Sequence, residues 1–444
     1  MEDKKRIYLF NGQRVWITNK DLNLLLLIWK HRVLSLGQVQ FYLRSRYQDS
    51  QNSIYQKLIK WNHMKIVTTE GYTEGKNLPY KCVRIAKNGM EILKKEGVKL
   101  DSDYNYKTLK IPKHATADHF FGTREVIVRF NLLAAEHDFH KFVSVHPIEL
   151  PYNDINEVKT FEQHVTPGAK LTPMVTPDWI LISDHAILNI ESDTGSEYSD
   201  VIVEKVKKYV DYVTQGLHSK DHHVLIVPPD SYDDDILTYV KPPPKDRSKR
   251  LGTLKDYIIR ASAHIIPNLH FHVVSSSRSG IVAYNILSGQ YRNRTEELSK
   301  VLGGFRDNPN LCEAVEEINP STIYGPSVEE ALYADQHLLI TGKDGISILV
   351  LVKLMEEGSV KSLDELELLN YLVKNDRLEK KVDKILAVYL TDNELQHDAL
   401  GERWDLQHVL FTSIQQLNKN GKSGAIFYRS VKPLKKSRCT LYEG

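Results

Sequence analysis

The first hundred residues combine helical stripes with short runs that are typical of strands. Ile54, Leu58 and Trp61 lie three or four residues apart, so they share one face of a predicted helix. The whole pattern predicts helices at 21–29, 35–43, 49–61 and 89–96, with strands at 65–69 and 80–85. Three helices followed by a β-hairpin are the order of a winged helix-turn-helix, which we assign to residues 1–100.

The middle of the chain alternates between apolar strand-like runs and amphipathic helices. A polar segment, residues 101–113, is expected to be a linker, and a second domain is expected over 114–290. The pattern there predicts helices at 117–136, 199–213 and 254–263 and strands at 177–182, 185–191, 223–227 and 269–274. This order indicates an α/β sandwich with a mixed central sheet. The basic, proline-rich segment 242–250 is expected to be a surface loop.

A third section, residues 296–444, is also expected to be an α/β domain. Its pattern predicts strands at 345–352, 384–390 and 424–428, helices at 363–373 and 409–417, and a basic tail over 432–438. At about 150 residues per domain, 444 residues agree with three domains. The fold class is therefore a mixture of α+β and α/β domains.

Composition excludes several classes of protein. With 41 % hydrophobic and 26 % charged residues the chain is typical of globular proteins. No apolar run approaches the roughly 18 residues of a membrane span, and no apolar core follows the charged first residues, so we expect neither membrane insertion nor a signal peptide. The three cysteines are far apart, which favours a cytoplasmic protein. Neither a Walker A signature nor a GxGxxG motif is present.

Charge is distributed unevenly along the chain. Residues 1–110 carry 21 Lys and Arg against 10 Asp and Glu, whereas the remaining residues carry 38 against 47. A basic N-terminal section suggests contact with the phosphates of double-stranded DNA. The third helix would present base-edge and phosphate-binding side chains outward, namely Gln51, Asn52, Tyr55, Gln56, Lys57 and Lys60. A winged helix used for protein contacts is the alternative.

Acidic residues gather at the ends of two predicted strands. Asp178 follows a proline at the start of one strand, and Glu191 and Asp193 end the next. Because strand side chains alternate, Glu191 and Asp193 are expected on one face. Such an oxygen-rich pocket suits Mg²⁺ or Mn²⁺, with Asp178 and Glu191 as ligands and Asp193 as a further acid. The metal would lower the pKa of a bound water and neutralise charge on a phosphate.

A phosphate-cleaving site also needs a cation, and the next helix supplies one. Lys205 lies just off the buried stripe of that helix, from where its amine can extend over the sheet edge. Tyr209, on the stripe, is interpreted as packing, with a role as covalent nucleophile as the alternative. The competing interpretation of the whole group is a solvated strand end beside a surface lysine.

The stretch TPDWIL…ILNIESDTGSEYSDVIVEKVKKY resembles the PD-(D/E)XK restriction-endonuclease-like core. Together with the preceding winged helix, it is similar to the replication-relaxation family of plasmid and mobile-element proteins, over residues 15–275. The resemblance implies a DNA-binding winged helix joined to a nuclease core. The family includes relaxases of the mobilisation type, which nick DNA. Replication or conjugation proteins are partners that it suggests, and a homodimer is a further expectation.

Carried over residue by residue, the resemblance matches Asp178 and Glu191 to the metal-binding acids. Asp193 stands where the superfamily usually has a lysine, so the lysine role is assigned to Lys205. Glu197 and Tyr209 match the family pattern, and Glu125, on the helix that leads into the domain, is a further candidate acid.

The last third of the chain suggests a degenerate, metal-free repeat of the nuclease fold. Both segments show an apolar strand, a polar turn, a helix with a tyrosine (Tyr209 and Tyr371) and another apolar strand, and Val352 falls where Glu191 stands. An unrelated α/β domain is the alternative.

Three functions remain open from the sequence. The first is a metal-dependent DNA endonuclease or nickase, and the second is a non-catalytic DNA-binding replication initiator or regulator that keeps the fold. The third is a structural partner in a conjugation complex, which would bind DNA weakly even at low salt.

Overall fold

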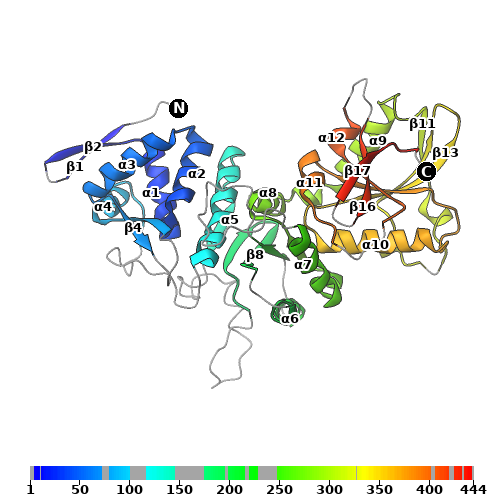
Figure 1. The fold of residues 1–444 in the computed structure, drawn as a ribbon, viewed down its shortest axis with the longest axis horizontal. Coiled ribbons are helices and arrows are strands. Elements are labelled where there is room, and N and C mark those ends of the chain that lie inside the picture. The colour runs from blue at the N-terminus through cyan, green and yellow to red at the C-terminus, as the bar shows by residue number, and fades with distance from the viewer. Residues whose placement is uncertain are drawn as a thin grey trace, which may run out of the picture. The chain divides into compact units, whose positions relative to one another are not determined.

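The structure is a computed structural model of the whole chain (Figure 1). The described residues are 5–10, 12–72, 80–100, 117–145, 175–195, 199–215, 220–228, 248–326, 328–401, 406–419, 425–432 and 435–442. Contacts divide them into two compact units, which we describe separately. The first contains the residues up to His140 together with 279–281, and the second contains the rest. The predicted linker 101–113 lies outside the described residues.

The N-terminal unit contains the predicted helices and hairpin, with additions. Its elements are β1 (Arg6–Phe10), β2 (Gln13–Ile17), α1 (Asn19–His31), β3 (Val33–Ser35), α2 (Leu36–Tyr47), α3 (Gln51–His63), β4 (Val67–Tyr72), β5 (Tyr80–Ile85) and α4 (Lys87–Lys95). Strands β1 and β2 form an antiparallel hairpin, and β3, β5 and β4 form a three-stranded antiparallel sheet in that order. The sequence pattern did not predict the β1–β2 hairpin or β3.

Side-chain caps determine where the first helices begin. Thr18 caps α1 and Ser35 caps α2, each in a capping box with the residue three positions later, Asp21 and Gln38. Ser50 caps α3, its Oγ accepting from the amide of Ser53 at 3.2 Å. Each cap satisfies an amide that the helix leaves without a partner.

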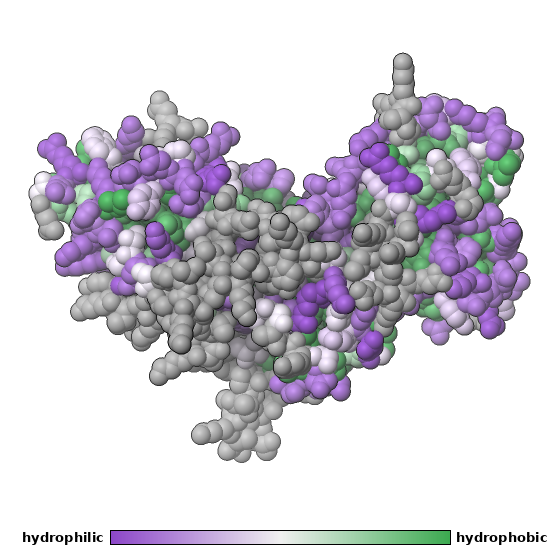
Figure 2. All heavy atoms as spheres, viewed as in Figure 1, coloured by the Kyte–Doolittle hydropathy of each residue, from purple (hydrophilic) through white to green (hydrophobic). Residues whose placement is uncertain are grey.

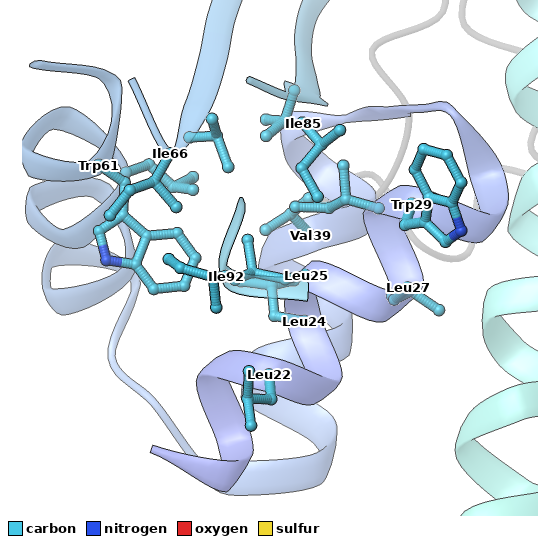
Figure 3. Close-up of a cluster of buried hydrophobic side chains, with 14 of the residues drawn as sticks. Leu22, Leu24, Leu25, Leu27, Trp29, Val39, Trp61, Ile66, Ile85 and Ile92 are labelled. Carbon is cyan, nitrogen blue, oxygen red and sulfur yellow. The ribbon is translucent and has the colours of Figure 1, made fainter. Parts of the chain in front are cut away.

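Leucines of α1 form the centre of the N-terminal core. Leu24, Leu25 and Ile28 are fully buried. Leu24 and Leu25 belong to one cluster with Trp61 of α3 and Ile85 of β5 (Figure 3). The predicted stripe of α3 is confirmed, since Ile54, Leu58 and Trp61 are its buried residues.

Helix α5 (Ala117–Glu136) has the predicted bounds and packs on this unit. Val128 joins the N-terminal core, Gln38 Nε2 donates to the carbonyl of Phe121 at 2.7 Å, and Arg124 Nε donates to that of His31 at 3.1 Å. The pattern along the chain assigns this helix to the second domain, whereas these contacts are with the first unit.

The second unit begins with a five-stranded sheet that is mixed, as the sequence predicts, although its first strand was not predicted. Its elements are β6 (Phe142–Val145), β7 (Trp179–Ser183), β8 (Ala186–Ser192), α6 (Ser199–Gln215), β9 (Asp221–Val227), α7 (Ser248–Arg260) and β10 (Leu269–Val273). The strand order is β6-β7-β8-β9-β10, antiparallel for the first two pairs and parallel for the last two. Helices α6 and α7 cover one face, where Val224 and Phe271 pack against Val206 and Leu254. Since α7 begins at Ser248, the predicted surface loop over 242–250 is wrong at its end.

A seven-stranded sheet follows the helices α8 (Ser276–Leu287) and α9 (Arg294–Arg306). Its elements are β11 (Ala314–Glu317), β12 (Gln336–Thr341), β13 (Ser347–Leu354), α10 (Val360–Lys374), β14 (Lys384–Tyr389), α11 (Asp392–His397), β15 (Val409–Ser413), α12 (Ile414–Leu417), β16 (Phe427–Lys432) and β17 (Lys435–Cys439), and the strands are ordered β11 to β17. Helix α10 packs on one face, and α9 and α12 pack on the other (Figure 1).

Two predictions in this domain are wrong. Residues 409–413 form a central strand between β14 and β16 rather than a helix, because a fully buried strand has a continuous apolar run without alternation. The expected basic tail contains strand β17, which pairs antiparallel with β16.

The two sheets of the second unit share a topology. Strands β11 to β15 have the same order as β6 to β10, with the same sequence of two antiparallel and two parallel pairs. An aspartate before the second strand of each makes the same hydrogen bonds. The Asp178 amide donates to Ile190 O at 3.0 Å and its Oδ2 accepts from the Ser192 amide at 2.8 Å, while Asp335 bonds likewise to Val352 O at 2.9 Å and to the amide two residues later at 2.7 Å.

This register corrects the alignment made from sequence. Val352 corresponds to Ile190, so Lys353, and not Val352, corresponds to Glu191. The two tyrosines are not equivalent either, because Tyr209 is buried and Tyr371 is 53 % exposed.

A buried ion pair joins the two sheets within this unit. Lys255 of α7 and Asp398 are almost completely buried, with Nζ 2.5 Å from Oδ1, and Nζ also donates to the carbonyl of Ala399 at 2.8 Å. Asp398 accepts in addition from Tyr389 Oη at 2.8 Å. Nearby, a Cβ at Gly252 would lie 2.5 Å from the Cα of Gly401, so α7 can approach this segment only with glycine there.

Removing the Lys255 amine should destabilise the second unit strongly. Lys255→Met leaves Asp398 charged and buried, which costs about 3–5 kcal/mol in unfolding free energy. Urea unfolding followed by tryptophan fluorescence measures the change. Lys300→Met, which breaks the surface pair with Glu296, is the control and should cost no more than about 1 kcal/mol. Equal small effects of both variants would contradict the assigned role of Lys255.

Candidate active site

Glu191 is the centre of a buried polar cluster at the end of β8. Its Oε2 lies 3.1 Å from Lys205 Nζ, and its Oε1 accepts a hydrogen bond from Tyr209 Oη at 2.6 Å. Both partners are on α6, one turn apart, so the predicted reach of Lys205 to the sheet edge is confirmed. Burial raises the pKa of Glu191 to about 7, while Lys205 and the tyrosine hydrogen bond act in the opposite direction.

Asp178 adds a second carboxylate next to Glu191. It stands immediately before β7, and its two backbone-directed hydrogen bonds join the start of β7 to the end of β8. Its negative charge raises the pKa of Glu191, as expected for neighbouring carboxylates. Trp179, the next residue, is anchored by Nε1 donating to Ser144 Oγ at 2.8 Å.

A small cavity lies between the cluster and the two helices. Its polar lining includes Glu191, Asp193, Lys205 and Tyr209, and its apolar lining comes from α6, α7 and the sheet. The cavity measures about 10 Å³, which is room for about one water molecule. Charges in such dry surroundings interact more strongly than they would in water.

Asp193 is held by an arginine that the sequence analysis did not single out. Arg250 Nε lies 2.8 Å from Oδ2 and its Nη2 2.8 Å from Oδ1, a bidentate pair. Oδ1 also accepts from the amide of Gly195 at 3.1 Å. Arg250 is in the first turn of α7, 57 residues from Asp193. The basic run around it is the only signal in the sequence, and that run predicts a surface loop.

The structure brings together most, but not all, of the predicted site residues. Asp178, Glu191, Lys205 and Tyr209 form one cluster, with Asp193 beside it. Glu197 lies outside the described residues. Glu125, in the N-terminal unit, forms an ion pair at 2.9 Å with Arg129, one turn along α5.

A donor set of this kind fits a divalent cation. Mg²⁺ binds through one or two carboxylates together with water and phosphate oxygens, and Asp178 and Glu191 supply neighbouring carboxylates. A carboxylate has about four acceptor positions, of which Glu191 uses one for Lys205 and one for Tyr209. The chemistry of the residues therefore agrees with the predicted metal site.

The side chains proposed to face DNA are mostly exposed on α3. Gln51, Asn52, Tyr55, Gln56 and Lys60 are exposed, as the sequence predicts. Lys57 differs, because its Nζ lies 2.6 Å from Asp21 Oδ1 and over the ring of Trp61. Hydrophilic residues cover most of the described N-terminal surface that is visible in Figure 2.

Comparisons with known proteins found one family. Searches of curated proteins and of solved structures gave no match. Among the described residues, no helix is both long and apolar enough to cross a membrane. The replication-relaxation family model matches residues 25–227, a range that includes α3, Asp178, Glu191 and Lys205. This confirms the resemblance seen in the sequence: residues 25–227 are similar to the replication-relaxation family.

Proposed function

We propose that this chain is a metal-dependent DNA endonuclease or nickase that acts on plasmid or mobile-element DNA. Its family suggests a role in the replication or mobilisation of such elements. The observation that carries the proposal is the cluster of Asp178, Glu191 and Lys205, two neighbouring carboxylates and a lysine at one sheet edge. Carboxylates and a lysine so arranged match the chemistry of phosphodiester hydrolysis.

In this mechanism Asp178 and Glu191 would hold Mg²⁺ or Mn²⁺. The metal, when bound, supplies a water of lowered pKa and neutralises charge on the phosphate. Lys205 stabilises the negative charge that develops on the phosphate, because its amine projects from α6 to the carboxylate edge. Tyr209 orients Glu191 through its hydroxyl and acts as a positioning residue. Arg250 keeps Asp193 out of the set of metal ligands by engaging both of its oxygens.

The folds of both units support this proposal. The N-terminal unit has three helices and a β-hairpin, which supports a winged helix that binds DNA. Its third helix exposes Gln51, Asn52 and Lys60. The mixed sheet with acids at the end of β8 and a lysine on α6 supports a PD-(D/E)XK-like core. The matching topology of β11 to β15 supports a degenerate repeat of that core.

A DNA-binding initiator or regulator without catalysis is the second candidate. The observation in its favour is Asp193, which stands at the usual lysine position and is locked by Arg250. The small cavity beside Glu191 agrees with a closed, structural cluster.

Nicking of supercoiled plasmid DNA from the host element tests the proposal. With Mg²⁺ or Mn²⁺ the wild-type protein should relax the plasmid, and Asp178→Ala, Glu191→Gln and Lys205→Met should each lose at least about 100-fold in rate. Glu204→Gln, an exposed change on the same helix, is the matched control and should keep the wild-type rate. If wild-type protein shifts this DNA on a gel but never nicks it, the initiator function replaces the nuclease.

The raised pKa of Glu191 predicts a dependence on pH. Because metal binding needs the carboxylate, nicking should increase as pH rises through about 7. Tyr209→Phe removes a hydrogen bond that lowers this pKa, so the rise should move to higher pH. Rate profiles from pH 5.5 to 9 measure the shift, and an unchanged profile would contradict the role of Tyr209.

The same pKa predicts the stability of the metal-free protein. A folded-state pKa above the usual 4.5 means that protonated Glu191 favours folding, and that this contribution is lost as pH rises from about 4.5 to 7. Urea unfolding should therefore show Glu191→Gln gaining stability over wild type across this range and holding a constant difference above it.

Lysines of α3 should differ in their contribution to DNA binding. Lys60→Ala should reduce the slope of log affinity against log salt by about 1, as for one lost phosphate contact. Lys57→Ala should change that slope less, because Asp21 already pairs with its amine. Fluorescence anisotropy with labelled duplex DNA at 50–300 mM salt measures both slopes. Equal slopes for Lys60→Ala and wild type would contradict a phosphate contact at Lys60 and would mean that DNA binds elsewhere on the unit.

A further inference from the structure

A second polar group lies on the other face of the five-stranded sheet. Side chains alternate along a strand, and Ile226, which pairs with Glu191, packs beneath α6 and α7. His223, three residues before Ile226, therefore points to the opposite face. His270 on β10 is the direct neighbour of His223, and Asp221 lies two residues before His223 on the same face of β9. The group is thus separate from the Glu191 cluster.

The three side chains converge closely enough to share one ion. Asp221, His223 and His270 each offer a ligand atom, and these atoms all lie within 4.8 Å of one another. A bound ion would need each of these atoms at the roughly 2.0–2.2 Å of metal–ligand bonds. All three residues are half-buried, so the group is anchored in the sheet and still open on one side.

Outer contacts hold the histidine rings in place. His223 Nδ1 lies 3.2 Å from Nε2 of the buried His272, and the rings of His223 and His270 stack at 4.7 Å between centroids. His272 in turn stacks on Tyr291. Metal-binding histidines commonly use one ring nitrogen for the ion and the other for such an outer contact.

The cluster borders a cavity of about 570 Å³. Its other wall comes from the second sheet and carries both signs of charge. Arg294 pairs there with Asp335 at 2.9 Å and with Glu356 at 3.1 Å, and Lys353 pairs with Glu365 at 2.6 Å. The histidine wall offers two imidazole nitrogens, donors that the residues named on the opposite wall lack, so it is the side of the cavity that suits a transition-metal ion. The cavity has room for water or a small ligand beside the ion.

We propose that Asp221, His223 and His270 bind a divalent transition-metal ion, with Zn²⁺ as the representative, at the wall of this cavity. Two imidazoles and a carboxylate are a donor set for transition metals, whereas Mg²⁺ prefers oxygen alone. Three protein ligands leave at least one coordination position open, and here it faces the cavity. The site is independent of the proposed nuclease site, since the two use different residues on opposite faces.

Metal binding by the full chain tests this proposal. Protein stripped with EDTA is titrated with Zn²⁺ by calorimetry at pH 7.5, with and without 5 mM Mg²⁺. We expect one equivalent to bind with micromolar or tighter affinity in both conditions. We expect Zn²⁺ binding to weaken at least about 10-fold in the double variant His223→Ala/His270→Ala, and likewise in the single variant Asp221→Asn. Zn²⁺ that binds only without Mg²⁺, or not at all, would overturn the proposal.

Control variants separate this site from surface histidines and from the nuclease site. His140→Ala, at an exposed histidine, should leave the Zn²⁺ affinity unchanged, and so should Glu191→Gln. Co²⁺ substitution adds a spectroscopic signature, because visible absorption bands should appear with wild type and be lost in the histidine variants. Asp221→Asn, nearly isosteric, serves if the double variant unfolds. Equal loss of affinity in His140→Ala, or Co²⁺ bands that persist in the histidine variants, would contradict the assignment.

Discussion

The buried charge of Lys255 is the constraint on which the second unit depends. Burying a lysine amine away from water costs several kcal/mol unless it has a partner, and here Asp398 and the carbonyl of Ala399 are its partners. Helix α7 must therefore stay against the segment that precedes β15. The same helix begins with Arg250, which holds Asp193, so the position of α7 also determines the geometry next to Glu191.

That constraint gives the two faces of the five-stranded sheet different surroundings. Under α6 and α7 the face is packed and dry, and burial keeps the pKa of Glu191 high. On the other face, His223 and His270 border a large polar cavity closed by the second sheet. The edge strand β10 of the five-stranded sheet also contacts the domain of the second sheet, because the amide of Val273 donates to the carbonyl of Gly358 at 2.9 Å. Alternation along β9 then places different chemistry on the two faces.

Local patterns predicted much of this fold, and distant contacts explain what they missed. The stripe of α3 and the position of Lys205 beside the stripe of α6 follow from helical periodicity alone. Arg250 could not be found in this way, because its partner is 57 residues away and its helix begins within a charged run. His223 and His270 become neighbours only through strand pairing across 47 residues. The pattern at 409–413 predicts a helix, whereas the structure has strand β15 there, because complete burial removes the alternation that identifies strands.

The second sheet clarifies what each residue of the candidate site contributes. Asp335 repeats the backbone bonds of Asp178, so these bonds are a feature of the fold rather than of any chemistry. The neighbouring ion pair between strand and helix has its charges reversed between the two sheets. In the first sheet the strand carries Glu191 and the helix carries Lys205, whereas in the second the strand carries Lys353 and the helix carries Glu365. Either arrangement neutralises a buried charge, which suffices for stability. In the first sheet the strand residue itself is a carboxylate beside Asp178, whereas in the second sheet Lys353 takes that place and its positive charge would repel a cation. Glu191 is therefore the residue that distinguishes the edge proposed to bind a metal ion from its counterpart in the second sheet.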